Sequence, residues 1–223
     1  MFNPEYLQQP PIDRVIFDLD STLSTIEGID ELAKFKGVEH KVVPLTTLAM
    51  AGELTMEEVF AQRLDAIGPS HHDLVRLGEL YCQSVTPGAQ ELIHKLTERH
   101  TKLFIVSGGY NPAVSFFGTF LGIPEEHIFA NELKFYPDGS YHDFRHDIPL
   151  WMNRGKHDII TQIMRKYPGN YALVGDSKGD MEAARLTERR ICFAGVVERP
   201  AATAIAQVTI REQNLMAVLP YLS

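Results

Sequence analysis

Two aspartates, Asp18 and Asp20, follow a short apolar run that begins after Arg14. The run indicates a buried strand, and a loop after its carboxyl end can aim both carboxylates at one point. One ionised carboxylate could attack phosphorus and form an aspartyl-phosphate. The other, held protonated by its neighbours, could donate a proton to the departing alkoxide and later accept one from water. The pair is therefore suited to the cleavage of a phosphomonoester.

Other residues could bind a cation, or supply positive charge, to balance the negative charge of this pair and of a phosphate. Asp176 and Asp180 offer carboxylate oxygens, which favour a hard cation such as Mg²⁺. Lys156, near the start of a predicted helix, could neutralise the phosphoryl oxygens in the transition state. Ser107 and Gly108 follow a second apolar run and offer a hydroxyl and accessible backbone N–H groups. We therefore expect a phosphate cradle beside a magnesium site.

Each of these features alone has an ordinary structural explanation. An Asp-x-Asp pair after a strand is often a turn or a helix cap, and alone it indicates catalysis only about one time in five. A Ser-Gly-Gly segment is often just a loop, and a single lysine at a helix start is usually solvated. The prediction of chemistry rests on the combination.

The elements that would position these residues alternate along the chain. Apolar runs predict strands over 14–18, 102–107, 171–176 and 190–194. Apolar residues at helical spacing predict helices over 89–96 and 159–167. This order indicates the α/β class, with a doubly wound, mostly parallel sheet whose ligands bind beyond the carboxyl ends of the strands.

Two segments interrupt that alternation. Residues 21–86 contain helical patterns without a convincing strand, so we expect an inserted helical cap, with residues 1–20 and 87–223 forming the core. Residues 129–144 carry Asp138-Gly139 between two aromatic-rich runs, which predicts a hairpin on the edge of the core with no catalytic role.

Composition narrows the class of protein. The 223 residues are 44% hydrophobic, enough for a sizeable core, and the formal net charge of −8 argues against a nucleic-acid-binding protein. Residues 1–11 do not resemble a signal peptide, and no segment has the length of apolar sequence that a membrane span needs. Two distant cysteines fit a reducing compartment. We expect a soluble cytoplasmic monomer or homodimer that binds neither nucleic acid nor membrane.

Four segments in this order resemble the motifs of phosphatases of the haloacid dehalogenase superfamily, most closely the phosphoserine phosphatase branch. They are Asp18-Leu19-Asp20-Ser21-Thr22, Ser107-Gly108, Lys156, and Gly175-Asp176 with Asp180. The resemblance implies a Rossmann-like core, Asp18 as the nucleophile, Asp20 as the general acid and base, and phosphate binding by Ser107, Gly108 and Lys156. It also implies Mg²⁺ bound by Asp18, the backbone carbonyl of Asp20, and Asp176, with Asp180 close by.

The resemblance extends into the helical segment, through residues 27–33, 50–52 and 63–64, and to 129–131. It implies that Glu27 faces a substrate ammonium and Arg63 a substrate carboxylate, with Met50 and Met56 as apolar walls. Such a pair of charges would select a free amino acid, which is a zwitterion. The implied reaction is hydrolysis of O-phosphoserine to serine and phosphate, the last step of serine biosynthesis.

The chain departs from the branch pattern at two places, which bear on the substrate rather than on hydrolysis. Gly179 stands where a polar side chain is usual, beside an added charge at Lys178, and residues 151–156 lack the usual glycine-rich lead. Hydrolysis of another small amino-acid-like or metabolite phosphate, phosphoryl transfer to an acceptor alcohol, and a catalytically silent phosphate-binding relative stay open as alternatives. Asp20 argues against a dehalogenase or phosphonatase, because those members of the superfamily lack that aspartate.

Overall fold

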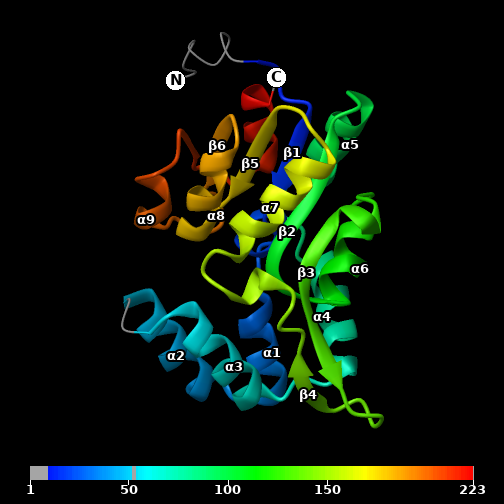
Figure 1. Ribbon diagram of the computed structural model, residues 1–223, viewed down its shortest axis with the longest axis vertical. Coiled ribbons are helices and arrows are strands. Elements are labelled where there is room, and N and C mark those ends of the chain that lie inside the picture. Colours follow the sequence, from blue (N-terminus) through cyan, green and yellow to red (C-terminus); the bar gives the residue numbers. More distant parts are fainter. Residues whose placement is uncertain (1–9, 52–53, 223) are drawn as a thin grey trace.

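The computed structural model describes residues 10–51 and 54–222, and its centre is a mixed β-sheet (Figure 1). The order across the sheet is β4-β3-β2-β1-β5-β6-β7, with every neighbouring pair parallel except β3 and β4. The strands are β1 (Arg14–Phe17), β2 (Lys102–Asn111), β3 (Ile128–Phe135), β4 (Tyr141–Phe144), β5 (Tyr171–Gly175), β6 (Arg189–Phe193) and β7 (Val208–Ile210). The chain adds strands on one side of β1 and later returns to its other side, which is the doubly wound pattern predicted from the sequence.

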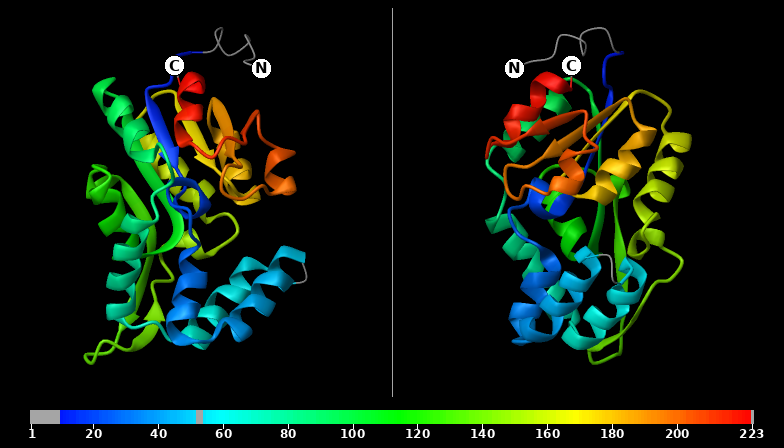
Figure 2. Two further views of the ribbon diagram at one scale, coloured as in Figure 1. Left: turned by 180° about the vertical axis from the view of Figure 1, so that it is seen from behind. Right: turned by 90° about the vertical axis from the view of Figure 1, so that its left-hand side faces the viewer.

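Helices cover both faces of this sheet (Figure 2). Successive side chains of a strand point to opposite faces, so Val15 and Phe17 pack in one apolar cluster and Ile16 in the other. The first cluster lies under α5 (Ala89–Glu98), α6 (Ala113–Phe120) and the 3₁₀ segment Leu215–Tyr221. The second lies under α7 (Gly155–Lys166), α8 (Lys178–Ala183) and α9 (Pro200–Thr203).

Four α-helices lie between β1 and α5 in the described part of the chain. They are α1 (Gly28–Lys36), α2 (Glu39–Ala51), α3 (Met56–Ile67) and α4 (His71–Gln83). Thr55 and Ser70 cap the N-termini of α3 and α4, and in each case the hydroxyl accepts the N–H three residues on, within a capping box. Figure 1 shows α1, α2 and α3 below the carboxyl end of β1, while α4 packs against α6.

The two ends of this helical segment lie side by side. Ser24 and Val85 form an isolated antiparallel bridge. The N–H of Thr25 donates to the carbonyl of Ser84 at 2.8 Å, and that of Thr86 donates to the carbonyl of Leu23 at 2.9 Å. The chain therefore leaves the core and returns to it at one point.

Strands β3 and β4 form the antiparallel hairpin that was predicted at the sheet edge, and the predicted α/β sheet is confirmed. Two features differ from the expectation. Strand β2 continues beyond residue 107 to Asn111, and β7 has no prediction because three residues are too few to show a period. Within the described ranges 10–51 and 54–222, no helix is long and apolar enough to cross a membrane.

Candidate active site

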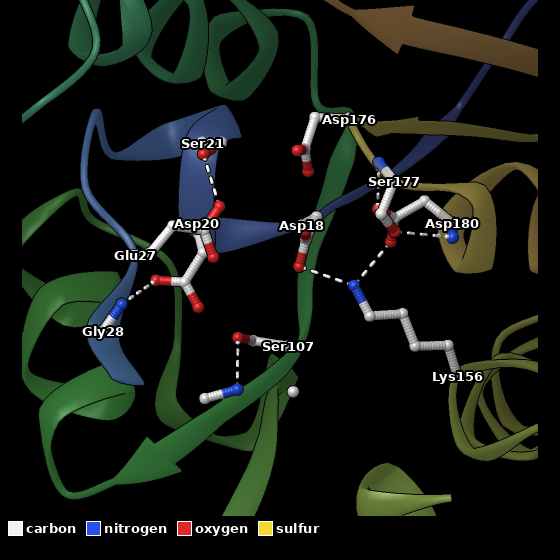
Figure 3. A network of polar contacts seen from close by, with 12 residues as sticks. Asp18, Asp20, Ser21, Glu27, Gly28, Ser107, Lys156, Asp176, Ser177 and Asp180 are labelled. Carbon is white, nitrogen blue, oxygen red and sulfur yellow. Dashed lines mark hydrogen bonds and ion pairs between the residues drawn. The ribbon is translucent and has the colours of Figure 1, made fainter. Parts of the chain in front are cut away.

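The order of the strands brings the predicted polar residues together. Asp18 follows β1, and the neighbouring strands β2 and β5 carry Ser107 and lead directly to Asp176. Because the three strands are parallel, these side chains meet at one edge of the sheet, and Lys156 reaches the same point from α7 (Figure 3). The structure therefore brings these residues together at one edge of the sheet, as the sequence predicts.

Three carboxylates form a buried cluster. Asp18, Asp176 and Asp180 are 6%, 2% and 1% exposed, and one ligand atom from each lies within 4.8 Å of the others. Lys156 Nζ pairs with Asp18 Oδ1 at 2.7 Å and with Asp180 Oδ1 at 2.5 Å. Two oxygens bound to one Mg²⁺ at about 2.1 Å lie about 3–4 Å apart, so this donor set fits a small hard cation.

Asp20 lies in a tight turn, Leu19–Leu23, in which Ser21 has φ 53° and ψ 12°. This left-handed conformation is uncommon for a residue with a side chain. The Asp20 carboxylate is not one of the three clustered groups, and its Oδ1 accepts from the N–H of Gly28 at 2.9 Å and from the hydroxyl of Tyr81 at 2.6 Å. If Asp20 contributes to a metal site, it must do so through its backbone.

The carboxyl groups are buried close to one another, which favours their neutral forms. Burial and the neighbouring carboxylates of Asp180 and Asp176 raise the pKa of Asp18 well above its ordinary value, against the opposing charge of Lys156. Burial and Glu27 raise the pKa of Asp20 to about 7, although two hydrogen bonds oppose the shift. The pKa of Asp176 is raised to about 6 by burial and Asp180. At neutral pH, Asp20 can therefore hold a proton.

Burial by itself would lower the pKa of Lys156. The carboxylates of Asp18 and Asp180 outweigh that effect and hold this pKa above its ordinary value. Lys156 is therefore a permanent positive charge beside Asp18.

Ser107 lies in an irregular part of β2. Val106 pairs with Phe129 and Tyr110 with Asn131, so β2 bulges between these pairs. Ser107 Oγ accepts the N–H of Gly109 at 2.9 Å, which leaves its own hydrogen available for a ligand. The buried Asn131 donates to the carbonyl of Gly108 at 2.9 Å. The hairpin therefore supports the cradle through Asn131, a contact that was not predicted.

Asp180 braces the loop after β5. Its Oδ2 accepts the N–H of Ser177 at 3.0 Å and the Ser177 hydroxyl at 2.5 Å. A Cβ on Gly175 would lie 2.5 Å from Cγ of Asp180, so only glycine permits this approach. Two residues of this loop depart from the branch pattern. Lys178 is exposed and pairs with Glu182, and a Cβ on Gly179 would make an ordinary contact with Ser177 Oγ at 3.7 Å.

A cavity of about 160 Å³ lies between the helical segment and the sheet. Its lining residues are Asp20, Glu27, Ile29, Phe60, Arg63, Gly108, Gly109, Tyr110 and Leu150. Arg63 is 7% exposed and its Nε has no hydrogen-bond partner. Among the described residues, no carboxylate pairs with Arg63. Met50 and Met56 belong to α2 and α3, and their side chains lie outside the described part of the structure.

Arg199 is part of the site although it belongs to no motif in the sequence. Its Nε donates to Asp176 Oδ2 at 2.6 Å and its second terminal nitrogen donates to Glu27 Oε1 at 2.7 Å. The guanidinium therefore joins the carboxylate cluster to the entrance of α1. A single arginine between β6 and α9 shows no period or spacing, and only the folded chain reveals its partners.

The segment without a glycine-rich lead has a packing role. Trp151 contacts Phe60 and Phe144, with ring centroids 6.4 and 5.5 Å apart. The N–H of Asn153 donates to Glu57 on α3 at 2.7 Å. A larger cavity, of about 310 Å³, lies beyond Leu150, but the carboxylate cluster does not line it.

Comparison with known proteins agrees with this geometry. Residues 15–185 match the model of the haloacid dehalogenase-like hydrolase family. The phosphoserine phosphatase of Bos taurus is 40% identical over 188 residues, which is 84% of each chain. Two solved structures, a phospho-aspartyl intermediate analogue of phosphoserine phosphatase and a substrate-bound phosphoserine phosphatase complex, each superpose with a TM-score of 0.83 at 27% identity. Each match covers 96% of this chain and 100% of the other. The chain therefore belongs to the haloacid dehalogenase-like hydrolase family.

Proposed function

We propose that this protein is a phosphoserine phosphatase, a phosphoric monoester hydrolase that acts through an aspartyl-phosphate on Asp18. The curated and solved relatives named above are phosphoserine phosphatases. The observation that supports phosphoserine as the substrate is the state of Arg63. This buried guanidinium has a nitrogen without a hydrogen-bond partner and lines the same cavity as Asp20. Burying a cation without a partner costs free energy, so its position in this cavity favours a ligand that brings a carboxylate.

The proposed reaction divides into two steps. Asp18 attacks the phosphorus while Lys156, Ser107 and the N–H groups near Gly108 hold the phosphoryl oxygens. Asp20 gives its proton to the departing serine oxygen, which is a poor leaving group without it. In the second step Asp20 takes a proton from the water that attacks the aspartyl-phosphate.

Substrate selection would use both ends of the cavity. Arg63 would bind the carboxylate of phosphoserine and Glu27 its ammonium, with Met50 and Met56 as apolar walls. Glu27 is bonded to Arg199 and to the Ser21 hydroxyl, so the ammonium would share this carboxylate with them. The observed pairing thus fixes Glu27 at the entrance of α1.

We propose Mg²⁺ as the cofactor, held by Asp18, Asp176 and the backbone carbonyl of Asp20. Support comes from the three buried carboxylates within 4.8 Å. The cation would shield Asp18 from the phosphate charge and polarise the phosphoryl group. Both oxygens of Asp180 already accept protein hydrogen bonds, so we assign Asp180 to holding Lys156 and the Ser177 loop.

We further propose that residues 21–86 form a cap that determines specificity, on a catalytic core of residues 1–20 and 87–223. Glu27 and Arg63 come from this segment, and its two ends meet at the Ser24–Val85 bridge. A cytoplasmic location is also proposed, supported by two free cysteines, Cys82 and Cys192.

Stability without metal should depend on pH with a defined sign. The folded-state pKa values of Asp20 and Asp176, about 7 and about 6, exceed the ordinary value of 3.8. At pH values between the ordinary pKa and these folded-state pKa values, the folded state binds more protons than the unfolded state. Rising pH therefore favours unfolding. Thermal unfolding in a chelator should therefore give a Tm that falls by several degrees from about pH 4 to about pH 7. Added Mg²⁺ should raise Tm more near pH 8 than near pH 5.

Asp176→Asn removes one of the carboxyl groups whose pKa is raised, and it should make the decline of Tm with pH shallower. A Tm that stays level or rises over this range in the metal-free protein would contradict the electrostatic account of the cluster.

The substrate assignment is tested by comparing kcat/KM for four compounds: O-phosphoserine, O-phosphothreonine, phosphoethanolamine and a sugar phosphate. We expect O-phosphoserine to exceed phosphoethanolamine, which lacks a carboxylate, by about 10²-fold or more. Product analysis with and without an added alcohol separates hydrolysis from transfer. Equal rates for both compounds would reject the serine assignment while leaving phosphatase activity intact.

A further inference from the structure

The two oxygens of the Asp20 carboxyl group have different surroundings. Oδ1 accepts hydrogen bonds from the Tyr81 hydroxyl at 2.6 Å and from the Gly28 N–H at 2.9 Å. Two donors occupy the acceptor positions of this oxygen, so it cannot readily carry the proton. Oδ2 faces the bulge of β2, because a Cβ placed on Gly109 would lie 3.7 Å from it. The proton that leaves with the alcohol therefore belongs on Oδ2.

Tyr81 is built into this arrangement. Its side chain is 0% exposed, lies on α4 behind the cavity wall, and packs against Phe117 with ring centroids 5.6 Å apart. A Cβ on Gly28 would lie 2.1 Å from the Tyr81 hydroxyl oxygen. The tyrosine reaches Asp20 only because residue 28 has no side chain.

We propose that Tyr81 is a positioning residue for the leaving-group step: with the Gly28 N–H, its hydroxyl holds Oδ1 of Asp20 so that Oδ2 presents the proton to the departing oxygen. This inference rests on the proposed phosphatase function. In the step itself, the bond between phosphorus and the substrate oxygen breaks, Asp18 gains the phosphoryl group, and the proton moves from Oδ2 to the departing oxygen. Tyr81 does not touch the substrate.

The dependence on the leaving group distinguishes positioning from a structural role. A serine alkoxide needs the proton, whereas acetate leaving from acetyl phosphate does not. The quantity to measure is kcat/KM, which covers only the steps through departure of the leaving group. For Tyr81→Phe we expect kcat/KM for O-phosphoserine to fall about 10- to 50-fold and that for acetyl phosphate to change less than about threefold.

Two further variants sharpen the test. Gly28→Ala displaces the Tyr81 hydroxyl and should reproduce the selective loss with the tyrosine present. Tyr171→Phe removes a buried hydroxyl that donates to the Tyr167 carbonyl at the other end of the sheet, and it should leave the ratio of the two substrates unchanged. Thermal unfolding of each variant shows whether the fold is retained.

The proposal is overturned if Tyr81→Phe lowers kcat/KM equally for both substrates, or for neither. If the unmodified protein does not hydrolyse O-phosphoserine, the substrate assignment fails instead. The comparison is then made with whichever alkyl phosphate it does hydrolyse, so the role of Tyr81 is still decided.

Discussion

Asp18→Asn should lower kcat for O-phosphoserine by at least about 10⁴-fold, because an amide cannot replace the carboxylate as nucleophile. Asp18 pairs with Lys156 and lies beside the carboxylates of Asp176 and Asp180. Asp180 also pairs with Lys156, but hydrogen bonds from Ser177 hold its other oxygen, so it should not replace Asp18 as the nucleophile. Release of inorganic phosphate in the presence of Mg²⁺ measures the effect.

Acid quenching during turnover of radiolabelled O-phosphoserine adds direct evidence for the intermediate. The unmodified protein should retain labelled phosphate and Asp18→Asn should retain none. Asp158→Asn, which changes a half-exposed carboxylate on α7, serves as the matched control and should keep full activity. If the activity of Asp18→Asn were close to that of the control, the proposed mechanism would be wrong.

Arg63→Met should reduce kcat/KM for O-phosphoserine by about 10²–10³-fold, the range expected when one partner of a buried charge pair is removed. Hydrolysis of phosphoethanolamine, which has no carboxylate for Arg63 to bind, should change less than about threefold. Methionine keeps much of the apolar volume of the arginine stem, so the comparison isolates the guanidinium.

The stability of this variant separates binding from structure. Since no described residue offers Arg63 a carboxylate partner, its replacement should leave Tm unchanged or raise it. A parallel loss for both substrates, or a clear fall in Tm, would mean that Arg63 holds the fold rather than the substrate.

The sheet and the core of the site follow from local sequence. Strands such as Arg14–Phe17 are short apolar runs that end in polar residues, and parallel strands deliver those residues to one edge. The convergence of Asp18, Ser107 and Asp176 is thus a consequence of strand order. By contrast, Tyr81, Asn131 and Arg199 join the site through contacts between distant elements, and such contacts leave no local period. From the sequence alone, Tyr81 is an ordinary buried aromatic residue of a helix. Its contact with Asp20 depends on the turn at Ser21, which only the folded chain reveals.

The bulge in β2 illustrates a second limit. The sequence Ser107-Gly108-Gly109 predicts a loop after the strand, because a pair of glycines is a common turn and loop signal. The structure instead resumes pairing with β3 at Tyr110, and the strand continues to Asn111. Whether a glycine pair ends a strand or bends it depends on the neighbouring strand, here β3, and so cannot be decided locally.

The bridge between Ser24 and Val85 has an evolutionary consequence. The N–H of Thr25 and the carbonyl of Ser84 are only 2.8 Å apart, so the polypeptide between them begins and ends at the same spot. A longer, shorter or different insert could join there without moving β1 or α5, since it would meet the same two anchoring points. Duplication and divergence could then exchange the recognition module while the hydrolytic machinery was inherited intact.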